Sequence, residues 1–125
     1  MVPVTKVNVA EKLATFNEYW SPRVAGELNG QHVKLVKVLG EFPWHTHAAE
    51  DEMFLVVKGQ FRLELRHSDR DGSLVLHEGE FAIVPRGVEH RPVAEHEAHV
   101  MVLEPAGTVN TGGVRNEFTT EAQPI

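Results

Sequence analysis

Beyond Pro22, short apolar runs alternate with turn-forming residues every eight to twelve positions. Residues 61–66 alternate strictly between apolar and polar side chains, which is typical of a strand with one face in water. Asn29-Gly30 is the strongest hairpin signal, because both residues tolerate the positive φ of a type I′ turn. Roughly eight short strands predict an all-β fold, a closed barrel or jelly roll, because closure removes unpaired strand edges.

The expected strands are separated by turns rich in Gly, Asp and Glu. They lie at residues 33–39, 52–58, 61–66, 74–76, 81–84, 90–94 and 99–104. We expect the strands at 52–58 and 61–66 to pair with each other about Gly59-Gln60. Turns are expected at Asp69, Asp71 and Gly72, and at Glu78-Gly79. From Pro105 the alternation is lost, which indicates a tail that wraps the surface or a partner subunit.

One short helix is expected near the N-terminus. Asn8 followed three residues later by Glu11 resembles a capping box, and Leu13 and Phe16 continue at helical spacing. The aromatic pair at residues 19 and 20 extends that spacing. Pro22 should end the helix, because proline disfavours helical geometry in the residue before it.

Composition narrows the classes of function. With 125 residues, 42% of them apolar and 24% charged, the chain predicts one globular domain spanning residues 1–125. A net charge of −6 argues against nucleic acid, whose binders cluster Lys and Arg. The apolar runs are too short to span a membrane, and the first twenty residues do not read as a secretory signal, so we expect a cytoplasmic protein. Without cysteine, any metal must bind to nitrogen and oxygen.

Candidate metal ligands concentrate in residues 40–59. His45 and His47 are two apart, so on an extended strand they project from one face. Glu52 follows beyond a short turn, and the turn at 85–87 delivers His90 to the start of a strand. Three imidazoles and one carboxylate suit a divalent transition metal such as Mn, Fe, Co, Ni, Cu or Zn and leave positions open for water or substrate. Because the ligands bind as neutral His and ionised Glu, occupancy should fall at acid pH.

These residues closely resemble the two motifs of the cupin superfamily. The first motif runs from a glycine through a His-x-His pair and a glutamate to another glycine, and His45, His47, Glu52 and Gly59 match it. The second motif, at residues 79–94, is matched in spacing by the residues Gly79, Pro85, Gly87 and His90. Two positions depart from the pattern: Gly40 lies one residue too close to His45, and Ala94 stands where the family has asparagine.

The resemblance implies a double-stranded β-helix, the jelly-roll barrel of cupins, with the metal held inside by the four matching residues. Glu50 and Asp51 compete with Glu52 for the acidic position, and the motif's spacing to Gly59 favours Glu52. The alternative is a set of hydrogen-bonded barrel histidines that hold no metal. The remaining histidines match no motif position and are expected at the surface or in loops: His32, His67, His77, His96 and His99.

The position of a residue in the alternation of a strand predicts whether its side chain faces the interior or the solvent. Phe54 and Val56 share the parity of Glu52 and should line the pocket. Trp44 is expected in core or interface packing rather than at the cavity mouth. The basic residues near the motifs are expected to be solvated: Lys58, Arg62, Arg66, Arg86 and Arg91. Of these, Arg86 and Arg91 flank His90 and could contact an anionic substrate. We identify no Lys or Arg that faces the interior. Besides the histidines, Glu52 is the one titratable residue that we expect to face inward.

Two functions fit these expectations. The first is a metal-dependent enzyme, an isomerase or oxygenase (dioxygenase), acting on a small molecule. The chain resembles the short single-domain cupins labelled as similar to mannose-6-phosphate isomerase, although the absence of an inward cation argues against a sugar phosphate. The second is a non-catalytic module that binds or senses a small ligand. The segment around Trp20 and the glycine-rich tail offer surface for a homodimer.

Overall fold

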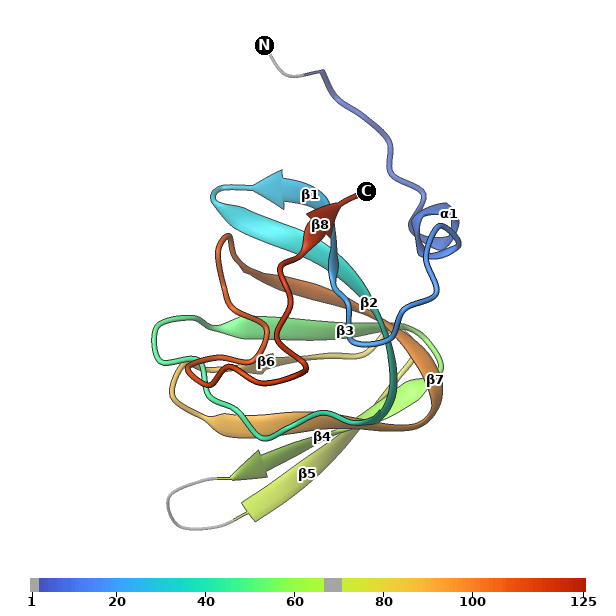
Figure 1. Cartoon of the computed structure of the whole chain (residues 1–125). Coiled ribbons are helices and arrows are strands. Elements are labelled where there is room, and N and C mark those ends of the chain that lie inside the picture. Colours follow the sequence, from blue (N-terminus) through green and yellow to red (C-terminus); the bar gives the residue numbers. More distant parts are fainter. Residues whose placement is uncertain (1–2, 67–70) are drawn as a thin grey trace.

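The computed structural model describes residues 3–66 and 71–125, and its regular secondary structure consists of strands apart from one short helix (Figure 1). The elements in chain order are α1 (Val9–Leu13), β1 (Arg23–Leu28), β2 (Gln31–Glu41), β3 (Glu52–Lys58), β4 (Gln60–Arg66), β5 (Asp71–His77), β6 (Phe81–Val84), β7 (Glu89–Pro105) and β8 (Gln123–Pro124). The fold is a jelly-roll barrel, as the strand pattern predicts.

Strand β7 organises the barrel. One of its edges pairs antiparallel with β2 along most of its length, from Gln31↔Pro105 to Glu41↔Val93. The other edge pairs with β3 near Val100 and with β4 near Val93. Strand β5 pairs with β4, and β6 pairs with β3, so the two halves of β7 belong to two facing groups of strands. This arrangement rolls the sheet around a common interior.

Two expectations about strand pairing were wrong. Strands β3 and β4 have the predicted positions but do not form a hairpin with each other: in the described part of the chain each pairs with a different half of β7. The expected strands at 90–94 and 99–104 are one strand of 17 residues. The exposed residues 95–97 interrupt the apolar alternation because they form an irregularity opposite β2, where the strand bends between the two halves.

Both turns that precede β2 and β6 are present. Asn29 and Gly30 have φ values of 50° and 75°, as a type I′ turn requires, and Leu28 pairs with Gln31 across it. Residues 78 and 79 form the turn before β6. Asp71 and Gly72, expected in a turn, begin β5 instead. Asp69 lies outside the described residues.

Helix α1 begins as predicted but ends early. The Asn8 side chain accepts a hydrogen bond from the Glu11 N–H at 3.0 Å, which caps the helix. The helix stops at Leu13, well before Pro22, because the following chain runs extended across β2, where the Trp20 N–H donates to the Lys37 carbonyl. Leu13 and Phe16 bury the outer face of β2 in a small second core.

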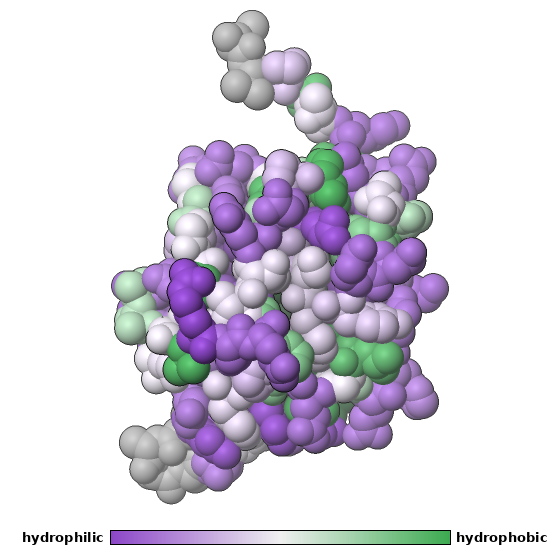
Figure 2. Space-filling model, viewed as in Figure 1, coloured by the Kyte–Doolittle hydropathy of each residue, from purple (hydrophilic) through white to green (hydrophobic). Residues whose placement is uncertain are grey.

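The main core fills the barrel. Its buried side chains include Val36, Val38, Phe54, Val56, Phe61, Leu63, Val100 and Val102. The tail after Pro105 returns over the same barrel and ends as β8, which pairs parallel with β1. No helix in the described ranges is long and apolar enough to cross a membrane. The face seen in Figure 2 is largely hydrophilic, with hydrophobic residues scattered among polar ones.

Candidate metal centre

The four motif residues converge inside the barrel. One ligand atom from each of His45, His47, Glu52 and His90 lies within 4.8 Å of the others. All four side chains are buried, and His90 is fully enclosed. Glu52 is the first residue of β3 and His90 the second of β7, while the two other histidines lie in the segment between β2 and β3.

Backbone hydrogen bonds hold the ligand-bearing segments together. The His45 N–H donates to the His90 carbonyl at 3.0 Å, and the His90 N–H donates back at 2.9 Å. The Gly87 N–H donates to the His47 carbonyl at 2.8 Å, so the turn before β7 also supports this segment. Residues distant in sequence are therefore placed by main-chain geometry and not by their side chains alone.

Hydrogen bonds to carbonyls select the tautomer of two imidazoles. His45 Nδ1 lies 3.0 Å from the Pro43 carbonyl oxygen, and His90 Nδ1 lies 2.9 Å from that of Val88. A carbonyl only accepts, so each Nδ1 carries the proton and donates. Each Nε2 is then left with a lone pair, the form in which imidazole binds a metal.

The donor set fits a cation. Glu52 Oε1 lies 3.2 Å from His90 Nε2, so an oxygen lone pair faces the nitrogen lone pair of that ring, and 3.5 Å from His47 Nε2. Neither ring nitrogen of His47 has a hydrogen-bond partner in the described part of the chain. An ion about 2.0–2.2 Å from each ligand would hold these atoms at most about 4.4 Å apart, so small adjustments close the site. The residues present therefore suit a divalent transition metal.

Electrostatics keep the ligands in their binding forms. Burial raises the pKa of Glu52, but the neighbouring Glu104, His47 and His90 side chains outweigh it and place the pKa well below its usual range. Burial, helped by the neighbouring His90, lowers the pKa of His45 to about 4. The carboxylate is thus ionised and the His45 imidazole neutral at physiological pH.

The lowered pKa of His45 predicts acid lability of the metal-free protein. An unfolded His45 titrates near 6.5, so the native state keeps its full stability above that pH and loses it as the pH falls toward 4. We expect a loss on the order of 3 kcal/mol in the free energy of unfolding, measured by urea denaturation of chelator-treated protein. His45→Gln should show a shallower pH dependence, and identical curves would contradict the assignment.

The competing carboxylates have other positions. Asp51 is half-exposed and accepts hydrogen bonds from the Arg86 backbone and guanidinium, at 2.9 and 3.2 Å from Oδ1. Glu50 Oε1 lies 3.9 Å from His47 Nδ1, beyond hydrogen-bond range. Neither belongs to the converging group, which contains Glu52.

The flanking cations are engaged elsewhere. Arg91 pairs with Glu64 at 2.6 Å and also approaches the ring of Trp44, which lies against the guanidinium of Arg66 at 3.8 Å. Three of the other histidines lie beside glutamates: His32, His77 and His99. His96 is exposed, and His67 falls outside the described residues.

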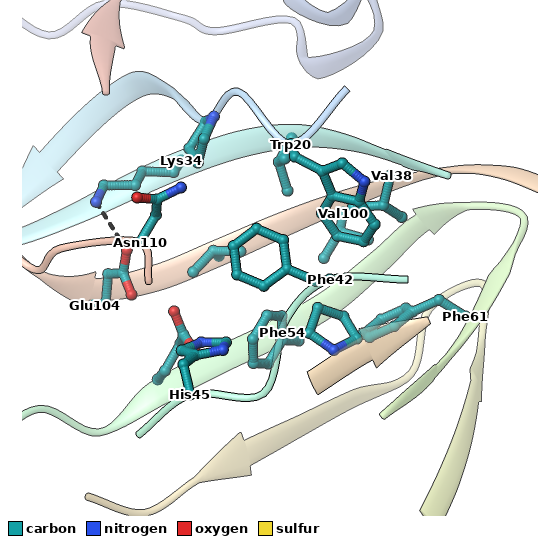
Figure 3. Close-up of a pocket in the computed structure, with 15 residues that line it drawn as sticks. Trp20, Lys34, Val38, Phe42, His45, Phe54, Phe61, Val100, Glu104 and Asn110 are labelled. Atoms are coloured by element: carbon teal, nitrogen blue, oxygen red, sulfur yellow. Dashed lines mark hydrogen bonds and ion pairs between the residues drawn. The ribbon is translucent and has the colours of Figure 1, made fainter. Parts of the chain in front are cut away.

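A cavity of about 50 Å³ adjoins the converging residues, and His45 and Glu52 are in its wall. Figure 3 shows His45 in this wall. Apolar and aromatic side chains form most of the remaining wall: Trp20, Pro22, Val36, Val38, Phe42, Phe54, Phe61, Pro92, Val100 and Val102. Phe54, predicted to line the pocket, lies in this wall. Val56, predicted to share that role, is buried in the core with 1% of its surface exposed.

Sequence reasoning missed two charged residues in the cavity wall. Lys34 and Glu104 are 3% and 2% exposed, and Lys34 Nζ lies 2.8 Å from Glu104 Oε1 (Figure 3). The expectations of no inward cation and no further inward carboxyl were therefore wrong. Parity could have found both, because Lys34 alternates in phase with Val36 and Glu104 with Val102.

Glu104 faces Glu52, one of the four converging residues. Burial, reinforced by the adjacent Glu52 carboxylate, raises the pKa of Glu104 to about 9. In the described chain, Oε2 of Glu104 has no hydrogen-bond partner. When this oxygen is protonated, it can donate toward the Glu52 carboxylate. The site therefore combines one ionised and one protonated carboxyl.

Comparison with known proteins agrees with this geometry. The chain is 30% identical over 83 residues to the uncharacterized protein YdbB of Bacillus subtilis, covering 66% of this chain and 65% of that relative's length. A cupin-2 domain containing protein from Shewanella frigidimarina has a crystal structure that matches with a TM-score of 0.75 at 44% identity, covering 79% and 93% of the two chains.

A more distant match shows the fold alone. Hydroquinone 1,2-dioxygenase from Sphingomonas sp. TTNP3, solved with 4-hydroxybenzoate bound, aligns with a TM-score of 0.68 at 22% identity, over 85% of this chain and 81% of that one.

The family profile for the cupin domain matches residues 32–105, which include both motifs and more than half of the chain. With its jelly-roll barrel and its buried group of three histidines and one glutamate, the chain belongs to the cupin family.

Proposed function

We propose that this cupin is a metal-dependent enzyme that transforms a small, largely apolar molecule, and that it is an oxygenase. One observation carries the proposal: His45 and Glu52 of the converging group share the wall of a single apolar cavity with Glu104, a buried carboxyl outside that group. A binding module needs no such acid beside its ligands, whereas an enzyme uses one for proton transfer. Glu104 therefore favours catalysis over simple binding.

Each group of residues in the site would have its own role in the reaction. His45, His47, Glu52 and His90 would hold the metal, which when bound can polarise a carbonyl, lower the pKa of water or, as iron, activate dioxygen. The aromatic wall excludes water and accepts an apolar substrate. Glu104 holds a proton beside this space, and Lys34 orients the Glu104 carboxyl through their contact.

The cavity argues against a sugar phosphate, the substrate that a mannose-6-phosphate isomerase-like assignment would suggest. Its wall is mainly apolar, and the ammonium of Lys34 is already paired with Glu104. The dioxygenase fold relative binds a phenol derivative, and a flat ring of that kind suits a wall containing Trp20, Phe42 and Phe54. Because about 50 Å³ is smaller than a ring, the wall must open to admit one.

The second candidate function is an isomerase, and the observation that supports it is the Glu104 carboxyl in the cavity wall. A carboxyl that can give and regain a proton next to a metal could move a proton along a carbonyl compound without dioxygen.

Loading the metal-free protein with Fe(II) or Zn(II) separates the candidates. The oxygenase proposal predicts dioxygen consumption by the iron form in the presence of hydroquinone or 4-hydroxybenzoate, and none by the zinc form or by Glu52→Gln. Deuterium exchange from D₂O into a carbonyl compound by the zinc form would instead support the isomerase. Saturable binding of the same phenols without turnover in either form would overturn both and leave a binding module.

We also propose a homodimer. The segments expected to form its interface are used within the chain, because Trp20 packs on Phe42 and the tail packs on its own barrel. Exposed apolar residues lie instead on β5 and on the edge strand β6: Leu74, Val75, Phe81 and Ile83. Light scattering at micromolar concentration should give twice the chain mass, and Phe81→Ser should lower it; a monomeric mass for the wild type rejects the proposal.

A further inference from the structure

The tail between β7 and β8, residues 106–122, is here named the C-terminal segment, and it is firmly held to its own barrel (Figure 1). Thr111 within it has no exposed surface. The Asn110 side chain donates to the Phe118 carbonyl at 2.9 Å and accepts from the Thr120 N–H at 3.1 Å. Thr111 and Thr119 are joined by a hydroxyl hydrogen bond of 2.6 Å. The segment is thus an ordered loop with internal cross-links.

This loop lies directly against the peptide between two metal ligands. A Cβ added at Gly112 would fall 2.1 Å from the carbonyl oxygen of Thr46 and 2.9 Å from its carbonyl carbon. Gly112 also has a φ of 66°, which disfavours any side chain. The Gly113 N–H donates to the same Thr46 oxygen at 3.4 Å. Only a glycine allows this approach to the backbone that links His45 to His47.

The loop reaches the site at two further points. The ring of Phe118 packs edge-on against Phe42 at 5.4 Å between centroids, and Phe42 in turn contacts the His45 imidazole at 5.2 Å. Asn110 forms part of the cavity wall near Lys34 and Glu104 (Figure 3). The loop therefore touches the ligand-bearing peptide, a ring behind one ligand and the cavity itself.

The ligand-bearing peptide is consequently held from more than one direction. Hydrogen bonds to His90 and Gly87 fix it to β7 and the preceding turn, and Gly112 lies against its Thr46 carbonyl. Resting on the proposed metal binding, we propose that the C-terminal segment is part of the metal centre, with Gly112 as a positioning residue for His45 and His47. Docking of the segment and binding of the metal are then coupled, so that each strengthens the other.

A pair of adjacent glycines provides the test. Gly112→Ala forces the Thr46 peptide or the loop to move, whereas Gly113→Ala meets nothing within 4 Å. We expect Gly112→Ala to weaken Zn(II) binding, measured by chelator competition, by about 10–100-fold, the range found when groups that orient ligands are lost. Gly113→Ala should stay within about twofold of the wild type, as unstrained surface changes do. The Co(II) absorption spectrum should change in Gly112→Ala and not in Gly113→Ala.

Coupling makes a second prediction that a purely structural role does not share. Arg115 is exposed in the segment and offers a trypsin site. If undocking weakens metal binding tenfold, the metal must reduce the undocked population by the same factor. Zn(II) should therefore slow cleavage after Arg115 by about that factor, while cleavage after Lys6 in the exposed N-terminal residues proceeds unchanged.

The outcomes separate this inference from the proposed function. If the wild type binds no zinc, the metal proposal itself fails. If the wild type binds zinc, and Gly112→Ala binds it equally well or zinc leaves Arg115 cleavage unchanged, only the role of the segment is overturned. Should Gly112→Ala not fold, Asn110→Ala, which removes the two hydrogen bonds of the Asn110 side chain, takes its place and is expected to lower zinc affinity several-fold; unchanged affinity would again reject the role.

Discussion

Glu52→Gln is expected to abolish tight metal binding while keeping the shape of the side chain. Glu52 supplies the anionic ligand of the group, and an amide oxygen carries no charge to replace it. We expect zinc affinity to fall by more than about 100-fold, because changes outside the ligand shell already reduce affinity by about 10–100-fold. Chelator competition at pH 7.5 measures the difference.

Glu50→Gln is the matched control, two residues earlier. Its carboxylate lies outside the converging group and beyond hydrogen-bond range of His47. Its removal should change affinity by about twofold or less, as is usual for changes away from the site. The reverse pattern, with Glu50 essential and Glu52 dispensable, would place the acidic ligand in the preceding turn.

Glu104→Ala is expected to lower the free energy of unfolding of the metal-free protein by roughly 2–3 kcal/mol, because it leaves the buried Lys34 ammonium without its hydrogen-bond partner. Glu104→Gln should lose about 1 kcal/mol or less, because a neutral amide replaces a carboxyl that is itself protonated at pH 7. Urea denaturation measures both.

The two variants also test the charge of Glu104. Equal losses in Glu104→Ala and Glu104→Gln would mean that the native carboxyl is ionised and that its pKa is not raised. Zinc binding by Glu104→Gln should remain close to that of the wild type, because Glu104 is not among the converging ligands.

The convergence of the ligand candidates could be anticipated because the sequence resembles the two cupin motifs, whose spacing to Gly59 also favoured Glu52 over Glu50 and Asp51. His45 and His47 lie two residues apart in the segment between β2 and β3, and the turn through Gly87 places His90 at the start of β7. Strand alternation in β3 marked Phe54 for the cavity wall. Local periodicity determines which face of a strand a residue occupies, but the meeting of four residues from separate segments was implied by the family resemblance.

The pairing of strands could not be anticipated in the same way. Alternation in β3 and β4 shows which side chains point inward, but it does not name the partner strand, and a short glycine turn suggested a hairpin. The bend in β7 hides a continuous strand because exposed polar residues at 95–97 break the pattern. Both errors concern contacts between distant segments.

The buried pair and the C-terminal segment escaped prediction for different reasons. Lys34 and Glu104 were not identified as inward-facing because isolated charges rarely lie in a core, and their contact with each other offsets the cost of burial. The contact of Gly112 with Thr46 involves two backbones, so no side-chain pattern announces it.

Anomalous diffraction from crystals of untagged protein, prepared without chelator and loaded with zinc, tests the metal centre most directly. A single strong peak is expected inside the barrel, about 2.0–2.2 Å from Nε2 of His45, His47 and His90 and from a carboxylate oxygen of Glu52. A barrel interior without a peak, or a peak held by other residues, would contradict the assignment of these four side chains as a metal site.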